Sequence, residues 1–152
     1  MRRMTPEQAA SLVQDGDTLL IGGSGGGHAV PDALLAALGA RFRAGGTPRG
    51  ITALHPVGVG DGGSRGLGHL AQQGLLKRNI AGSYVNSPPV GARALRDEIE
   101  AWSLPQGALS QLMREMAAGR PGLLTKTGLH SFVDPRLQGG RQSPSAREDL
   151  VE

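Results

Sequence analysis

Five glycines fall within six positions between a short apolar run and a helical pattern, in the stretch TLLIGGSGGGHAVPDALLAAL at positions 18–38. The apolar run TLLI predicts a buried strand. After Pro31, apolar side chains recur at helical spacing until Gly45 and Gly46 end the pattern. A strand, a glycine loop and a helix in this order are typical of the carboxyl edge of a parallel sheet, where open α/β proteins bind ligands.

The alternation of strand and helix continues along the chain. We expect a helix over 5–17, because Thr5, Pro6 and Gln8 fit a capping box with proline in the first turn. The other expected elements are strands at 51–54, within 77–85 and at 123–128, helices at 31–45, 69–76, 88–102 and 108–122, and a short extended piece running into LPQG. The predicted fold class is α/β, an open, mostly parallel sheet with helices on both faces.

The domain organisation follows from length. A chain of 152 residues fits one domain with a real core. We assign positions 1–140 to this domain and interpret the polar stretch 141–152 as a tail, the start of an element that the chain does not complete. The last apolar residues of the tail have no expected partner, which indicates a truncated chain.

Composition narrows the classes of function. Glycine accounts for 25 residues and aromatic side chains for only 3%, so the core must consist of Leu, Ala, Val and Ile. The net charge is +3, but the basic residues are scattered and lack aromatic neighbours for stacking on bases, which argues against nucleic acid. The absence of cysteine excludes disulfides and thiolate chemistry and favours the cytoplasm. We expect neither a signal peptide nor a membrane span, since no apolar run is long enough.

The glycine loop can be a ligand cradle or a tight structural turn. Bare N–H groups beside the start of a helix favour an anion or an oxyanion. The spacing does not match G-x-G-x-x-G, the P-loop GK[ST] is absent, and Ser24 lacks the flanking pattern of G-x-S-x-G. The candidate residues of this loop are Gly22, Gly23, Ser24, Gly25, Gly26 and Gly27.

Two further loops carry polar candidates. His55 opens a glycine-rich loop after the second strand and His69 follows it, and either could be an acid–base group or a metal ligand. Four histidines without paired spacing argue against a metal site. Gln106, in LPQG, stands where the extended piece meets a helix, and its amide can donate to a developing oxyanion or brace the loop.

Several separated motifs resemble, in order, the family I coenzyme A transferases, and they are most similar to the acetate or short-chain acyl-CoA and 3-keto-acid transferases. The resemblance covers positions 5–142. It is carried by DGDTLLIGGSGGGHAVPDALLAAL, GDGGSRGLGHLAQQGLLKRNIAGSY, IEAWSLPQGALSQLMREMAAGRPGLLTKTGL and FVDPRLQGG.

The resemblance implies an open α/β fold of the CoA-transferase and ribose-phosphate isomerase type. It implies ping-pong transfer of CoA between carboxylic acids through a glutamyl-CoA thioester, with CoA as substrate and no bound cofactor or metal. Gln106 is implied as the oxyanion donor. The glycine loop 22–27 and the residues His55, Val57, Gly58 and Gly107 are implied to line the acyl pocket.

Two departures from the family pattern shape the expected function. Ser24 stands where the family usually has an aromatic residue, and the nucleophilic glutamate lies outside this chain, which matches an N-terminal portion. We therefore expect inactivity of the chain alone, a partner region in cis or a beta-type subunit in trans, and an oligomer without nucleic acid or membrane. The alternatives are a non-catalytic module of this fold that binds a small anion or a sugar phosphate, and a marginally folded fragment.

Overall fold

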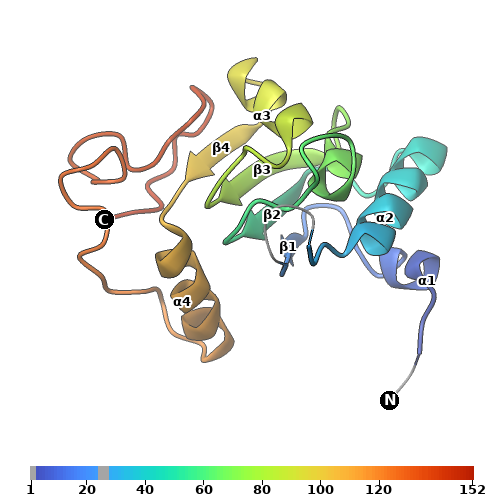
Figure 1. The fold of residues 1–152 in the computed structure, drawn as a ribbon, viewed down its shortest axis with the longest axis horizontal. Coiled ribbons are helices and arrows are strands. Elements are labelled where there is room, and N and C mark those ends of the chain that lie inside the picture. Colours follow the sequence, from blue (N-terminus) through green and yellow to red (C-terminus); the bar gives the residue numbers. More distant parts are fainter. Residues whose placement is uncertain (1–2, 24–27) are drawn as a thin grey trace.

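The computed structural model describes residues 3–23 and 28–152 and contains one all-parallel sheet of four strands. The strands are β1 (Thr18–Leu20), β2 (Ile51–His55), β3 (Leu76–Ala81) and β4 (Glu100–Ser103), and they lie side by side in that order (Figure 1). The helices are α1 (Pro6–Ala10), α2 (Asp32–Gly45), the 3-10 helix η1 (Gly66–Leu70), α3 (Pro88–Leu95) and α4 (Gln106–Ala117). The expected open parallel sheet is confirmed.

Local sequence signals explain where α1 begins and where α2 ends. Thr5 and Gln8 form the predicted capping box, in which the Gln8 N–H donates to the Thr5 hydroxyl and the Thr5 N–H donates to the Gln8 side chain. Helix α2 stops at Gly46, which adopts a left-handed conformation with φ of 67°. None of the described helices has the length and apolar character needed to cross a membrane.

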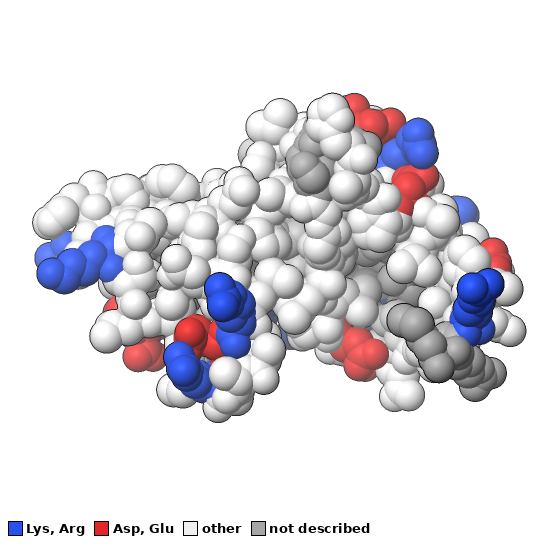
Figure 2. Space-filling view, turned by 60° about the horizontal axis from the view of Figure 1, so that its bottom comes forward, with Lys and Arg blue, Asp and Glu red and all other residues white. Residues whose placement is uncertain are grey.

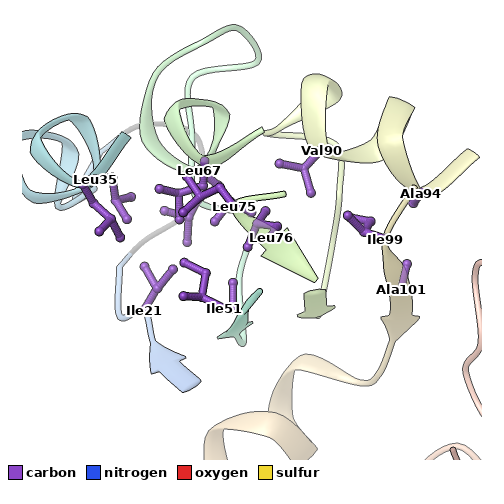
Figure 3. Close-up of a cluster of buried hydrophobic side chains, with 14 of the residues drawn as sticks. Ile21, Leu35, Ile51, Leu67, Leu75, Leu76, Val90, Ala94, Ile99 and Ala101 are labelled. Carbon is purple, nitrogen blue, oxygen red and sulfur yellow. The ribbon is translucent and has the colours of Figure 1, made fainter. Parts of the chain in front are cut away.

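The main core lies on the face of the sheet that α2, η1 and α3 cover (Figure 3). Successive side chains of a strand point to opposite faces. Ala53 of β2 and Ala101 of β4 therefore face this core, together with Leu35 of α2 and Leu67 of η1, and all four are buried. Small strand residues let the helices approach the sheet closely, which suits a chain with few aromatic residues.

A smaller core lies on the other face, under α4. Leu54, Ile80 and Trp102 point to this side and pack with Leu109 of α4. Figure 1 shows α4 on the opposite side of the sheet from α2 and α3. The prediction of helices on both faces is confirmed.

The stretch beyond 140 is folded along the outer edge of β4. The Gln142 N–H donates to the Ala101 carbonyl, and the Ala101 N–H donates to the Ser143 hydroxyl. Ala146 is buried, and Leu150 packs against the smaller core. The final apolar residues thus have a partner, which the sequence interpretation did not foresee.

Five element predictions need correction. The helix expected over 5–17 ends at Ala10. Strand β1 is half exposed rather than buried, because it lies at the edge of the sheet. The segment 69–76 contains the end of η1 and, at Leu76, the start of β3 rather than a helix, and 123–128 forms no strand, with Leu124 fully exposed. The predicted helix over 88–102 ends at Leu95, and β4 begins within it. Asp97 is the reason, since its left-handed φ of 57° turns the chain back toward the sheet.

Candidate functional site

The candidate site is the carboxyl edge of the sheet, where four loops follow four parallel strands. The Ile21 N–H donates to the Leu54 carbonyl, so the ends of β1 and β2 meet at one edge as predicted. With strands about 4.8 Å apart, β1 and β4 are separated by about 14 Å along this edge. Gly22, which follows β1, and Gln106, which follows β4, thus mark opposite ends of the site.

Gln106 is the first residue of α4 and is exposed. Its side-chain amide makes no hydrogen bond to any described residue. The main-chain carbonyl of Gln106 accepts a hydrogen bond from the Ser110 hydroxyl. The amide is therefore free to donate outward, beside the unpaired N–H groups and positive dipole end of a helix of 12 residues. Gly107 is also exposed, and a Cβ at this position would meet no atom within 4 Å.

Gly82, which follows β3, lies between Gln106 and the loop after β2. A Cβ on Gly82 would overlap the carbonyl oxygen of Pro56 and lie 3.0 Å from its carbonyl carbon and 3.4 Å from the Cα of Gln106. Only glycine fits between these two segments. Gly82 thus lies in contact with both Pro56, in the loop after β2, and Gln106.

The loop after β2 is held from inside by the segment 84–87. A Cβ on Gly58 would lie 2.8 Å from Cγ of Asn86, and the Ser87 hydroxyl donates to the Val59 carbonyl. Gly60 is packed against the Asn86 carbonyl. Gly58 and Gly60 are therefore required by contact with the protein itself, and Val57 packs against the main core.

His55 is 1% exposed and makes two contacts through its ring. Nδ1 lies 2.6 Å from the Val57 carbonyl oxygen and Nε2 lies 3.1 Å from the Asn79 side chain. Burial lowers the pKa of His55. The structure places Oδ1 of Asn79 at Nε2. A neutral ring has one N–H, so with Nδ1–H donating to Val57 we assign the Asn79 amide the opposite orientation, in which Nδ2 donates to Nε2. That orientation also provides a partner for Nδ2 of Asn79, which is otherwise buried without one.

The remaining predicted residues lie at the β1 end. Gly22 has open space around it, whereas a Cβ on Gly23 would lie 2.6 Å from the Ala29 carbonyl oxygen. Ser24 and Gly25 to Gly27 lie outside the described residues. The structure does not bring Gly22 and Gly23 next to Gln106, because β2 and β3 lie between them.

Asp32 is the first residue of α2, and its carboxylate is bound by other residues of the chain. Asp32 accepts hydrogen bonds from the Gly66 N–H at 2.7 Å and from Arg65, and lies 3.1 Å from Nε2 of His69. The Gly66 N–H and the Arg65 guanidinium hold the pKa of Asp32 below its usual range. An anionic ligand at this helix start would meet Asp32, which argues against the sugar-phosphate alternative. Within 3–23 and 28–152, no three His, Asp or Glu side chains gather as a metal site.

Comparison with known proteins places this chain in a family. The family model described as "Coenzyme A transferase" matches residues 3–151. The chain belongs to the coenzyme A transferase family. The resemblance drawn from the motifs is thereby confirmed.

Relatives within the family are longer than this chain. "Acetate CoA-transferase YdiF" of Escherichia coli (strain K12) is 36% identical over 149 residues, which cover 98% of this chain and 28% of YdiF. The alpha subunit of an acetate CoA-transferase of the same strain is 30% identical over 135 residues, which cover 89% of this chain and 58% of that relative. The chain corresponds to an N-terminal portion of YdiF.

A solved structure agrees with the fold. The acyl-CoA transferase YdiF of E. coli O157:H7, described as a thioester complex with CoA, superimposes with a TM-score of 0.94 at 36% identity. The match covers 98% of this chain and 29% of that chain. The CoA-transferase fold predicted from the motifs is confirmed.

Sequence reasoning missed the residues that organise this edge from inside. Gly82 and Asn86 fix the loop after β2, and Asp32 fixes the start of α2. A glycine directly after the apolar end of a strand was a usable signal for Gly82, because the same arrangement follows β1. Asp32 had no such signal, since its partner Gly66 lies 34 positions away.

Proposed function

We propose that this chain is the part of an acyl-CoA:carboxylate CoA-transferase that supplies the oxyanion donor Gln106 and part of the acyl pocket. The observation that carries the proposal is the free amide of Gln106 at the start of α4, on the carboxyl edge of the sheet. An amide so placed can stabilise negative charge without adding a charge of its own. Gly22 to Gly27, Val57, Gly58 and Gly107 are proposed as pocket residues on the family resemblance, and His55, which the resemblance also implies, is proposed to hold the Val57 carbonyl from behind the pocket.

The proposed chemistry proceeds through two acyl transfers. A glutamate carboxylate oxygen attacks the thioester carbonyl carbon, the C–S bond breaks, and CoA leaves as the thiolate. The thiolate then attacks the glutamyl carbonyl of the mixed anhydride, which releases the carboxylic acid and forms glutamyl-CoA. A second acid reverses these steps to accept CoA. Each tetrahedral intermediate carries an oxyanion, toward which the Gln106 amide donates.

The glutamate is proposed to come from outside this chain. Four of its glutamates are tied to arginines: Glu98 to Arg93 and Arg96, Glu100 and Glu148 to Arg78, and Glu115 to Arg120. Glu100 begins β4 and so lies at the amino edge, opposite Gln106. These ion pairs favour a structural role for the glutamates.

His55 acts in this proposal as a positioning residue. Its Nδ1–H holds the Val57 carbonyl, and its burial separates the ring from any substrate. The loop that begins at Pro56 approaches Gln106 across Gly82.

The finer assignments follow from the family resemblance. We propose short-chain acyl or 3-keto acyl groups as substrates and the cytoplasm as location. The partner region is either the remainder of a longer chain, as in YdiF, or a separate second chain, which the name of the alpha-type E. coli relative implies for that protein.

The test uses a hybrid transferase in which this chain replaces the matched segment of YdiF. We expect the hybrid to transfer CoA from acetyl-CoA to a second short-chain acid, measured by chromatography of the CoA esters, and the isolated chain to show none. Transfer by the isolated chain would show that the nucleophile lies within it. A folded hybrid without transfer would contradict the proposed function.

A further inference from the structure

The carboxyl end of β4 is held from two sides. On the side of β3, the Leu104 N–H donates to the Ala81 carbonyl at 2.9 Å. On the outer side, the Ser103 N–H donates to the Gly140 carbonyl at 2.8 Å. Gly140 ends the loop of residues 126–140, which contains no helix or strand and lies beside the end of β4 (Figure 1). This 126–140 loop is therefore the outer neighbour of the segment that leads into α4.

The 126–140 loop also reaches Pro105, the residue that precedes α4. A Cβ on Gly128 would lie 3.7 Å from Cγ of Pro105, so the two residues are neighbours. Pro105 caps α4 without a side-chain hydrogen bond, and its carbonyl accepts from the Leu109 N–H in the first turn. The position of Gln106, which begins the helix, thus depends on where the loop holds Pro105.

Asp134 holds the 126–140 loop together. Its side chain is only 1% exposed. Its Oδ2 accepts from the His130 N–H at 2.8 Å and from Nη2 of Arg136 at 2.6 Å, and its Oδ1 accepts from the Arg136 N–H at 3.0 Å and from Nε at 2.9 Å. Its main-chain carbonyl accepts from the N–H groups of Leu137 and Gly139. One buried carboxylate thus joins the first part of the loop to the last.

The turn that the carboxylate holds has an uncommon conformation. His130 has a φ of 63°, in the left-handed region that residues other than glycine seldom adopt. Such conformations persist where surrounding contacts fix them, and the His130 N–H is fixed by Asp134. The next residue, Ser131, donates to the Gly128 carbonyl through its N–H at 3.2 Å and its hydroxyl at 2.6 Å. Asp134 therefore determines the turn that places Gly128 against Pro105.

Charge does not account for the position of Gln106. Figure 2, which turns the underside of Figure 1 toward the reader, shows a broad area without charge between separate groups of charged side chains. The Gln106 amide is bonded to no described residue, and only its main-chain carbonyl has a side-chain partner. Its position is set by the contacts of residues 103–105.

We propose that Asp134 is a positioning residue of the transferase reaction, which acts through the 126–140 loop and Pro105 to aim the Gln106 amide at the developing oxyanion. The inference rests on the proposed function. Gly82 fixes the helix start from the side of β3, and Asp134 fixes it from the outer side. Asp134 acts on the reaction only through Gln106, so loss of its carboxylate shifts the donor without removing it.

The experiment measures kcat and KM of the hybrid transferase with Asp134→Asn. Asparagine keeps the size of the side chain but must turn its NH₂ group toward either the His130 N–H or Arg136, which are both donors. Glu98→Gln is the matched control, because Glu98 also accepts from two arginines but precedes β4, at the amino edge of the sheet. We expect Asp134→Asn to lower kcat by about 10–10²-fold with little change in the KM for acetyl-CoA, and Glu98→Gln to change neither.

The same substitution in the Gln106→Leu background separates positioning from a structural role. A residue that acts through Gln106 should lower kcat no further in that background, whereas a structural defect would lower it by the same factor in both. Arg136→Gln is the milder variant, at an arginine that is 66% exposed, and should lower kcat less, with the same dependence on Gln106. Unchanged kcat for Asp134→Asn, an equal loss for Glu98→Gln, or the same loss in both backgrounds would overturn the proposal.

Hydrogen exchange of the isolated chain tests the inference without transfer activity. The Leu109 N–H, bonded to the Pro105 carbonyl, should exchange faster in Asp134→Asn than in the unaltered chain. The Leu35 N–H, bonded to the Pro31 carbonyl at the start of α2, should not change. Arg136→Gln gives the same comparison if melting curves show that Asp134→Asn does not fold.

The two measurements distinguish the inference from the function on which it rests. Unchanged exchange at Leu109 would overturn the role of Asp134, even in an active hybrid. A folded hybrid without transfer would contradict the proposed function, and faster exchange at Leu109 would then still support the hold of Asp134 on the start of α4.

Discussion

Gly82→Ala tests whether the loop after β2 and the start of α4 meet as described. The new Cβ would lie 3.0 Å from the Pro56 carbonyl carbon and closer still to its oxygen. Since carbon atoms in contact prefer about 3.5–4.0 Å, the carbonyl carbon alone requires the segments to separate by about 0.5–1 Å, and the closer oxygen requires more. Overpacking of this kind costs about 1–3 kcal/mol. For a chain of this length, each kcal/mol lowers the melting temperature by about 2–4 °C.

Two assays measure the consequences. Calorimetry of the isolated chain should show the lower melting temperature for Gly82→Ala. Gly107→Ala is the matched control, since its Cβ meets nothing within 4 Å and alanine favours the first turn of α4. In the hybrid transferase, the displaced Gln106 should lower kcat by up to about 10²-fold. If Gly82→Ala melts with the unaltered chain and keeps its kcat, the described junction is wrong.

The remaining predictions concern two buried polar side chains, His55 and Tyr84. Because burial lowers the pKa of His55, the folded state binds fewer protons than the unfolded state at acidic pH, so the free energy of unfolding should fall as the pH drops below about 6.5. His55→Gln should flatten that part of the profile in urea titrations at several pH values, and an unchanged profile would contradict a buried neutral His55. Tyr84 donates to the carbonyls of Asn79 and Trp102, so Tyr84→Phe should cost about 1 kcal/mol in the same titrations. Burial raises the pKa of this single tyrosine to about 12, so stability should be lost as the pH rises above about 10, and absorbance of tyrosinate near pH 10 in the folded protein would contradict its burial.

The sequence was sufficient where a local pattern determines the structure. Thr5 and Gln8 predict the start of α1, and Gly46 predicts the end of α2, because capping depends on residues a few positions apart. The parallel sheet followed from the order of strands and helices. Gln106 was found at the start of a helix because a short motif carries it.

The remaining features depend on contacts between distant segments. The helical pattern runs through Asp97 and hides the turn before β4. The carboxylate of Asp97 accepts a hydrogen bond from the Ser145 N–H, 48 positions away. Whether an apolar run is buried also depends on neighbours, and among the described residues β1 pairs with a strand on one side only. From its place in a loop, His55 was predicted as an acid–base group or a metal ligand, but the ring is buried and its partner Asn79 belongs to the next strand.

The central claim is that this chain contributes an oxyanion donor to a reaction whose nucleophile lies elsewhere. The most direct measurement is the kcat of the hybrid transferase with Gln106→Leu, compared with Gln111→Leu, an exposed glutamine on the same helix. Loss of one such donor lowers kcat by about 10²–10³-fold. We expect a loss of this size for Gln106→Leu and none for Gln111→Leu. Equal kcat values for the two folded variants would contradict the claim.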